Sequence, residues 1–164
     1  MNETDRIADQ LKRAFYGEAW SGPSVKEVLE GVTAEMAAKR PIQDAHSIWE
    51  LVHHMTAWVD IVRRRVEGES VKVTEDVNFP PVKDTSESAW NESLKRMEQA
   101  AAELQKTILG ISESRLEQPA VEGGSSVYNQ VHGAVQHSLY HAGQIMLLKK
   151  AGNTHRRRYS TIDA

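Results

Sequence analysis

The sequence contains no cysteine. Disulfide bonds, thiolate nucleophiles and cysteine-ligated zinc or iron–sulfur sites are therefore excluded. The absence of disulfides fits a protein of a reducing compartment. Any metal site in this chain has to use donors other than sulfur from cysteine.

The chain also lacks a long apolar run and a strong charge of one sign. No stretch approaches the roughly 20 apolar residues of a membrane span, and the charged N-terminus has no apolar core of the kind that a signal peptide needs. The net charge is -3, so no overall field attracts nucleic acid or anionic lipid. We expect a cytoplasmic protein that binds neither nucleic acid nor membranes.

The length and composition are those of one globular domain. The chain has 164 residues, which is too few for a second independent core. Its 40% hydrophobic and 26% charged residues separate it from disordered and fibrous proteins. We expect one domain over residues 1–152, followed by a polar, basic C-terminal tail over residues 153–164 that contains Arg156-Arg157-Arg158.

Hydrophobic spacing predicts helices and gives almost no support for strands. Four principal helices are expected over residues 3–20, 45–67, 84–109 and 125–152. A capping box at Ser24-Val25-Lys26-Glu27 predicts a short helix in the insertion between the first two, and residues 69–83 are expected to form a loop. The third helix carries a heptad seam, which is typical of near-antiparallel packing in a bundle: Trp90, Leu94, Met97, Ala101, Leu104 and Ile108. The fold class is therefore all-α, a four-helix bundle.

The chain has seven histidines, and His137 and His141 lie one helical turn apart. Residues four apart on a helix differ by about 40° around its axis, so the two rings share a face and can reach one metal ion. On the second long helix, His54 lies at the edge of the apolar stripe, whereas His53 points toward solvent. His54 is therefore the third candidate ligand; the alternative is a boundary histidine with one nitrogen in water. Of the other histidines, His46 is expected on an outer helix face, His132 at a surface or interface, and His155 in the tail.

The fourth predicted helix is apolar on two sides. One side carries the candidate ligands and is formed by Gln130, Ala134, His137, His141, Gln144, Ile145 and Leu148. The roughly opposite side is formed by Val131, Val135, Leu139, Ala142 and Met146. A helix that is apolar on both sides is buried on both sides. The second stripe therefore predicts a homodimer, and the alternative is that the insertion over residues 24–41 folds over it.

Two segments resemble the DinB family, also called the DinB/YfiT-like family. In the segment from His46 to Trp58, a histidine is followed by an apolar residue and shortly afterwards by a tryptophan. The segment from His137 to Ile145 reads HSLYHAGQI and matches the pattern H-x-x-Y-H-x-G-Q-I throughout. The resemblance extends over roughly residues 3 to 151. It implies a bundle with up-down-down-up connectivity, a metal site made of three histidines with the first ligand at His54, and frequent dimerisation.

The resemblance implies little about the reaction. The family includes transferases and isomerases that use low-molecular-weight thiols, and members assigned as metal-dependent hydrolases. Three imidazole ligands leave a coordination position open, as in catalytic metal sites. That position can lower the pKa of a bound water or stabilise a thiolate. We expect a divalent transition metal, zinc or nickel first, with iron and manganese also compatible.

Three functions are compatible with these features. The first is hydrolysis of a small substrate by activated water. The second is metal-dependent thiol transfer with bacillithiol, mycothiol or glutathione, and the third is a non-enzymatic metal-binding or stress-related module. Glu50 and Gln144 lie one turn from ligand histidines and are candidate partners for them, and Tyr140 is a candidate hydrogen-bond donor to a substrate. For each of these three residues, the alternative is a packing or surface role.

Overall fold

The protein is built from helices. The computed structural model describes the backbone of residues 2–159 and the side chains of residues 2–153. In this part the helices are α1 Glu3–Tyr16, α2 Val25–Leu29, α3 Ala34–Ala38, α4 Ile48–Val66, α5 Glu75–Asn78, α6 Glu87–Gly110, α7 Glu113–Leu116 and α8 Val127–Tyr159. The described chain contains no strand, apart from one isolated antiparallel bridge between Pro119 and Ser126. The all-α prediction is confirmed.

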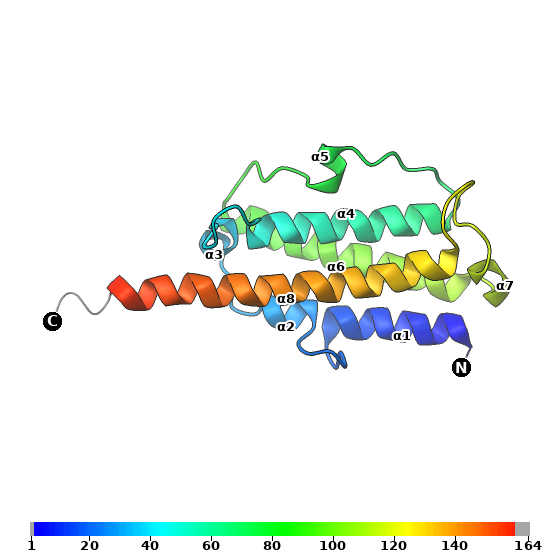
Figure 1. Cartoon of the computed structure of the whole chain (residues 1–164), viewed down its shortest axis with the longest axis horizontal. Coiled ribbons are helices and arrows are strands. Elements are labelled where there is room, and N and C mark those ends of the chain that lie inside the picture. Colours follow the sequence, from blue (N-terminus) through cyan, green and yellow to red (C-terminus); the bar gives the residue numbers. More distant parts are fainter. Residues whose placement is uncertain (1, 160–164) are drawn as a thin grey trace.

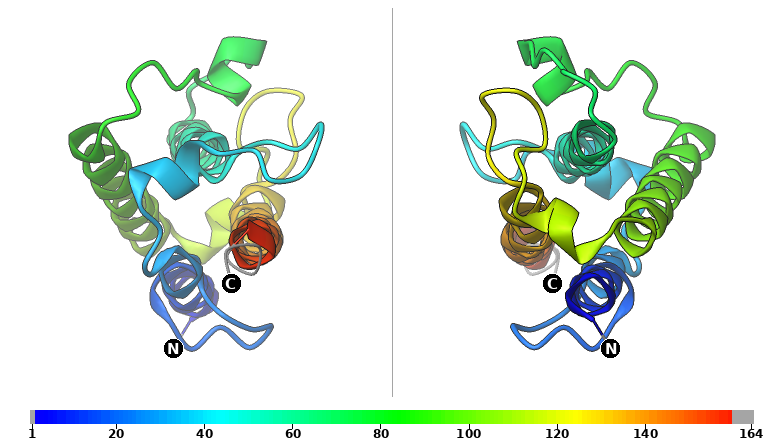
Figure 2. Two further views of the ribbon diagram at one scale, coloured as in Figure 1. Left: turned by 90° about the vertical axis from the view of Figure 1, so that its left-hand side faces the viewer. Right: turned by 90° about the vertical axis from the view of Figure 1, so that its right-hand side faces the viewer.

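The four long helices, α1, α4, α6 and α8, pack as a bundle (Figure 1). α4 and α6 run in one direction, and α1 and α8 run in the opposite direction. This is the predicted up-down-down-up order. Seen along the bundle, α1 lies diagonally across from α4, and α6 lies diagonally across from α8 (Figure 2). As a result, α4 packs against both α6 and α8.

Because α4 and α6 are parallel, the segment between them has to return along the length of the bundle. This crossover, residues 67–86, carries α5 over the outer side of α4 (Figure 1), and α5 contacts α4. The sequence predicts a loop over residues 69–83, and the structure differs by the presence of α5. A helix of 4 residues is too short for hydrophobic periodicity to reveal it.

Local capping signals set both ends of α4. The Ser47 side chain accepts a hydrogen bond from the backbone N–H of Glu50, and the Glu50 carboxylate accepts one from the backbone N–H of Ser47. The two bonds form a capping box. At the other end, Gly68 adopts a φ of 94°, which a glycine tolerates best and which stops the helix.

Two helix ends differ from the prediction. α1 ends at Tyr16 and does not reach Trp20, because Gly17 leaves the helical conformation with a φ of 141°. α8 does not end at Gly152 but continues to Tyr159. Gly152 does not adopt the positive φ of a helix-ending glycine. The backbone of residues 153–159 is therefore helical, and the side chains of the predicted tail from residue 154 onward lie outside the described part.

The heptad seam of α6 forms part of the core, as predicted. Trp90, Met97, Ala101, Leu104 and Ile108 are all buried. The indole Nε1 of Trp90 also donates a hydrogen bond to the backbone carbonyl of the segment between α2 and α3, at 2.9 Å. The short helices are thereby attached to the end of α6.

Both apolar sides of α8 are covered within one chain. The side that bears the candidate ligands faces α4, and α1 and α2 pack against α8 as well. Val131, Val135 and Ala142 of the second stripe are buried. α2 of the insertion and α1 therefore account for part of this burial, while Leu139 and Met146 of the same stripe are half-buried. Tyr140 and Leu147 remain exposed on α8, and the homodimer stays a prediction.

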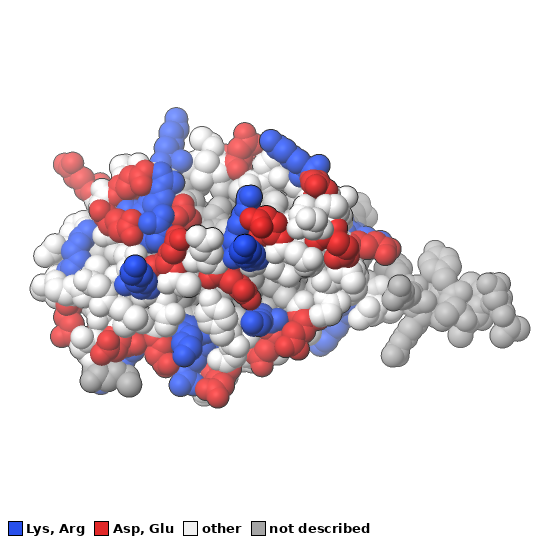
Figure 3. Space-filling model, turned by 180° about the vertical axis from the view of Figure 1, so that it is seen from behind, with Lys and Arg blue, Asp and Glu red and all other residues white. Residues whose placement is uncertain are grey.

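Charged side chains of both signs are mixed over the surface. On the face seen in Figure 3, lysine and arginine side chains lie next to aspartate and glutamate side chains. Ion pairs link neighbouring helical turns, for example Arg63 with Asp60 at 2.7 Å and with Glu67 at 2.8 Å. None of the described helices is long and apolar enough to cross a membrane.

The burial of the α6 seam predicts a stability effect. Leu104 is 0% exposed, so Leu104→Ala leaves a cavity and should lower the free energy of unfolding by about 2–5 kcal/mol. Leu109 lies on the same helix and is 52% exposed, so Leu109→Ala should change the free energy of unfolding by about 0.5 kcal/mol or less. Urea denaturation of the two variants measures the difference. Equal effects would contradict the placement of Leu104 in the core.

Candidate metal centre

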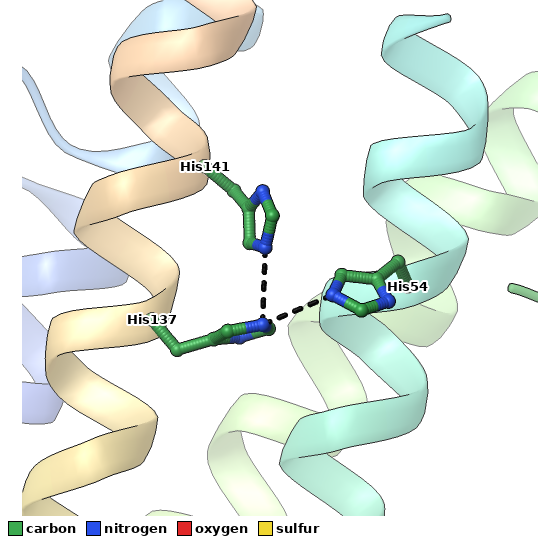
Figure 4. A group of neighbouring side chains, drawn as sticks. All are labelled: His54, His137 and His141. Carbon is green, nitrogen blue, oxygen red and sulfur yellow. Dashed lines mark hydrogen bonds between the residues drawn. The ribbon is translucent and has the colours of Figure 1, made fainter. Parts of the chain in front are cut away.

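Three histidine rings meet between α4 and α8 (Figure 4). His54 points from α4 toward His137 and His141, which lie one turn apart on α8. His137 Nε2 lies 3.0 Å from His54 Nε2 and 3.0 Å from His141 Nε2. One nitrogen from each ring lies within 4.8 Å of the other two. The structure thus brings together the three residues expected to bind a metal.

The hydrogen bonds at the far side of two rings define which nitrogens are free. His54 Nδ1 donates to the backbone carbonyl of Asn78 at 2.7 Å, and His141 Nδ1 donates to the side-chain oxygen of Gln144 at 2.5 Å. In a neutral imidazole the second nitrogen is then an acceptor. Two Nε2 lone pairs are therefore directed at His137 Nε2, which can carry one proton at most. A cation between the rings would satisfy all three nitrogens, so the donor set fits a metal ion.

The crossover fixes the orientation of the His54 ring. Phe79 stacks on His54 with ring centroids 4.1 Å apart, and its other face stacks on His46 at 3.9 Å. Asn78, whose backbone accepts the His54 proton, is held in turn by its side chain, which accepts a hydrogen bond from Trp58 Nε1 at 2.8 Å. Sequence reasoning missed Asn78 and Phe79, because the segment over residues 69–83 carries no periodic signal.

His53 does not point toward solvent, as the helical wheel predicts. Its ring is half-buried. His53 Nδ1 donates to the backbone carbonyl of Pro80 at 3.1 Å, and His53 Nε2 lies 3.0 Å from Ser93 Oγ of α6. The wheel fails here because the crossover and α6 cover the side of α4 that it assigns to water. The ring nonetheless stays outside the cluster of His54, His137 and His141.

The three candidate partner residues occupy different environments. Gln144 contacts the cluster directly, through its hydrogen bond with His141. Tyr140 is 65% exposed, and its ring lies edge-on to His141 with centroids 5.2 Å apart. Glu50 bonds to Arg40 and to the backbone of Ser47. Burial raises the pKa of Glu50, but these bonds outweigh it and the pKa lies below its usual value. Its carboxylate is committed to these partners.

Burial keeps the three histidines of the cluster neutral. It is the largest cause that lowers the pKa of His54, His137 and His141 below the ordinary value of 6.5. For His137, repulsion from the other two rings adds to burial, and the pKa falls to about 4. The hydrogen bonds to Asn78 and Gln144 act in the opposite direction on His54 and His141 without cancelling the effect of burial. Neutral imidazole is the form that binds a metal ion.

A cavity of about 360 Å³ opens beside the cluster, between α4 and α8. His54 and His137 form part of its wall, so the space between the rings can be reached from it. Its volume lies in the range of about 300–1,000 Å³ that small-molecule pockets occupy. The other lining residues are Trp58, Val59, Val62, Arg65, Asn78, Asn129, Gln130, Gly133 and Ala134.

The fold and the histidine cluster together define a helical bundle with a candidate metal site between two adjacent helices. The chain belongs to the DinB superfamily, whose family model matches residues 21–145. A crystal structure of a conserved protein from Enterococcus faecalis is similar with a TM-score of 0.67, at 15% sequence identity, over 92% of this chain and 97% of that chain. No curated protein matches the chain. The resemblance to the DinB family is confirmed.

The cluster predicts metal binding that depends on its own histidines. Metal-free protein should bind zinc or nickel. The double variant His137→Ala, His141→Ala should lose more affinity than the roughly 10- to 100-fold that is typical when a residue hydrogen-bonded to a metal ligand is changed. His132→Gln is the matched control, because His132 lies on the same helix but outside the cluster. Metal analysis and calorimetric titration measure both. Equal metal content in the double variant and the control would rule out this site.

The lowered pKa values predict a pH dependence of stability in the metal-free protein. Between pH 6.5 and about 4, the unfolded chain binds a proton at His137 that the folded chain does not bind. The free energy of unfolding should therefore fall as the pH is lowered through this range. Above pH 6.5, His137 should not make the free energy of unfolding depend on pH. His137→Gln should show a shallower fall. Urea denaturation at pH 7, 6 and 5 tests this, and identical slopes for both proteins would contradict it.

Proposed function

We propose that the protein is a metal-dependent enzyme that hydrolyses a small substrate, with a divalent transition metal held by His54, His137 and His141. The main support is the convergence of three neutral imidazole nitrogens beside a cavity of small-molecule size, whose wall includes His54 and His137. Structural zinc sites are usually closed by four protein ligands, whereas catalytic sites keep a position for water or substrate. Three protein ligands beside a cavity fit the catalytic kind.

Zinc and nickel are the ions that we expect at this site, with iron or manganese as alternatives. When bound, the ion supplies a Lewis acid that activates water near neutral pH. Asn78 and Gln144 hold the Nδ1 protons of His54 and His141, so the Nε2 lone pairs face the site. Outer hydrogen bonds of this kind orient the ligand rings before an ion or a substrate binds.

The lining of the cavity binds and positions the substrate. None of its residues carries a carboxylate, and the carboxylate of Glu50 is engaged by Arg40 and Ser47. The walls are mainly apolar and keep a bound substrate away from bulk water. We therefore assign substrate binding and orientation to the lining residues. We do not assign a role in proton transfer to any carboxylate.

Metal-dependent thiol transfer is the second candidate, and the size of the cavity favours it. About 360 Å³ admits a small organic thiol as well as water. The chain has no cysteine, so the thiol would come from a low-molecular-weight cofactor such as bacillithiol, mycothiol or glutathione. The third candidate is a metal-binding or stress-related module without turnover, in which a bound ion would serve stability alone.

A comparison of reactions distinguishes these candidates. Protein loaded with zinc or nickel should hydrolyse members of a panel of small esters and amides, and His141→Ala should lower kcat/KM by about 100-fold or more, since three-histidine ligation sets the Lewis acid. His132→Gln should retain the activity.

The same protein is assayed with each thiol and an electrophilic aryl chloride. Turnover that requires an added thiol, with no hydrolysis, would replace the hydrolase by the transferase. A metal-dependent rise in Tm without turnover of either kind would favour the non-enzymatic module.

A further inference from the structure

Three successive arginines near the end of α4 have different partners. Arg63 pairs with Asp60 and Glu67, at 2.7 and 2.8 Å. Arg64 forms an ion pair with Glu69. The Arg65 side chain forms no ion pair or hydrogen bond with any residue in the described part of the chain, and its guanidinium carbon lies 5.8 Å from the centroid of the Trp58 ring. The positive charge of Arg65 is thus not neutralised by a carboxylate.

Arg65 is also the arginine of the three that lines the cavity beside the histidine cluster. Helical side chains lean toward the N-terminus of their helix, and this direction takes the Arg65 side chain back toward Trp58 and the histidines. The cation–π contact with Trp58 holds the guanidinium in place. An arginine that is positioned in a cavity, and free of carboxylates, is suited to bind an oxyanion of a ligand.

The cavity therefore has two different ends. His54 and His137 lie at one end, and Arg65 marks the other. The Trp58 ring connects them, because its centroid is 6.3 Å from the His54 ring and 5.8 Å from the Arg65 guanidinium carbon. α4 and α8 run antiparallel, so Asn129, which precedes His137 on α8, lies toward the Arg65 end.

The wall between the two ends is apolar and has room. It contains Trp58, Val59, Val62 and Ala134, which suit a hydrocarbon part of a ligand. Gly133 also lines it, and a Cβ added at Gly133 would meet no atom within 4 Å. Glycine within a helix costs about 1 kcal/mol relative to alanine, so Gly133 keeps space open at the expense of helix stability.

We propose that this cavity takes a small organic acid, whose carboxylate binds Arg65 and whose apolar body lies against Trp58. The opposite end of the acid then reaches His54, His137 and His141. This assignment rests on the proposed function only where it calls the ligand a substrate; that substrate is a carboxylate that carries a hydrolysable ester or amide bond at the end opposite its free carboxylate. Binding of the acid itself requires neither a metal nor turnover.

The test uses metal-free protein and measures binding directly. Hexanoate, phenylacetate and 3-phenylpropanoate are titrated by calorimetry, next to the neutral isostere phenylacetamide. At least one acid should bind more tightly than phenylacetamide. Arg65→Gln should weaken binding of the acid by about 10- to 100-fold, as expected for loss of a charged hydrogen-bond partner. Arg64→Gln is the matched control and should bind as the unmodified protein does.

A second variant tests the cavity without changing any charge. Gly133→Leu places a side chain in the cavity and should abolish binding of the acid, while Gly133→Ala should raise Tm and bind the acid with less than about a threefold change, because a methyl group fills little of the space. Thermal melting shows whether each variant is folded.

The outcomes separate the two proposals. The acid site is overturned if none of the acids binds at millimolar concentration, if phenylacetamide binds as well as phenylacetate, or if Arg65→Gln and Arg64→Gln behave alike. Binding that depends on Arg65, in a metal-loaded protein that hydrolyses no carboxylate bearing an ester or amide bond at its far end, such as an acetylated ω-hydroxy acid, would keep the acid site and overturn the hydrolase.

Discussion

The antiparallel contact between α4 and α8 is the constraint on which the candidate site depends. His137 and His141 are held at their spacing by the backbone hydrogen bonds of one helix, but His54 reaches them only when the two helices are in register. A slide by one helical turn would move His54 by about 5.4 Å, far more than the few tenths of an ångström that metal–nitrogen bonds tolerate. Buried residues of both helices, such as Met55 of α4 and Ile145 of α8, help to keep this register.

Local signals in the sequence were sufficient for most of the fold and for the three histidines of the cluster. The second long helix was expected over residues 45–67 and extends over Ile48–Val66, where a capping box at Ser47 and the glycine at position 68 mark its ends. The spacing of His137 and His141 predicted a shared helix face without any tertiary information. The position of His54 at the edge of an apolar stripe separated it from its neighbour His53, because the angle between successive residues on a helix is fixed.

The sequence could not reveal what surrounds α4. A helical wheel assigns one side to the core and the other to water, but α4 contacts α6, α8 and α5. The ring of His53 is therefore held by Pro80 and Ser93 where the wheel predicts solvent. The partners of His54, Asn78 and Phe79, lie in an aperiodic segment, and their contact depends on the path that this segment takes across the bundle.

The parallel arrangement of α4 and α6 has a consequence for divergence among proteins of this topology. It obliges every such chain to include a long connection across the outside of the bundle, and in this protein that connection contacts His54 of the candidate site. This connection adds little to the hydrophobic core, since none of its residues 67–86 is fully buried and only the half-buried Val82 packs against the core. Mutations and insertions there can accumulate with little loss of foldability while they alter the histidine environment. New chemistry can thus arise on an old framework without a redesign of the interior.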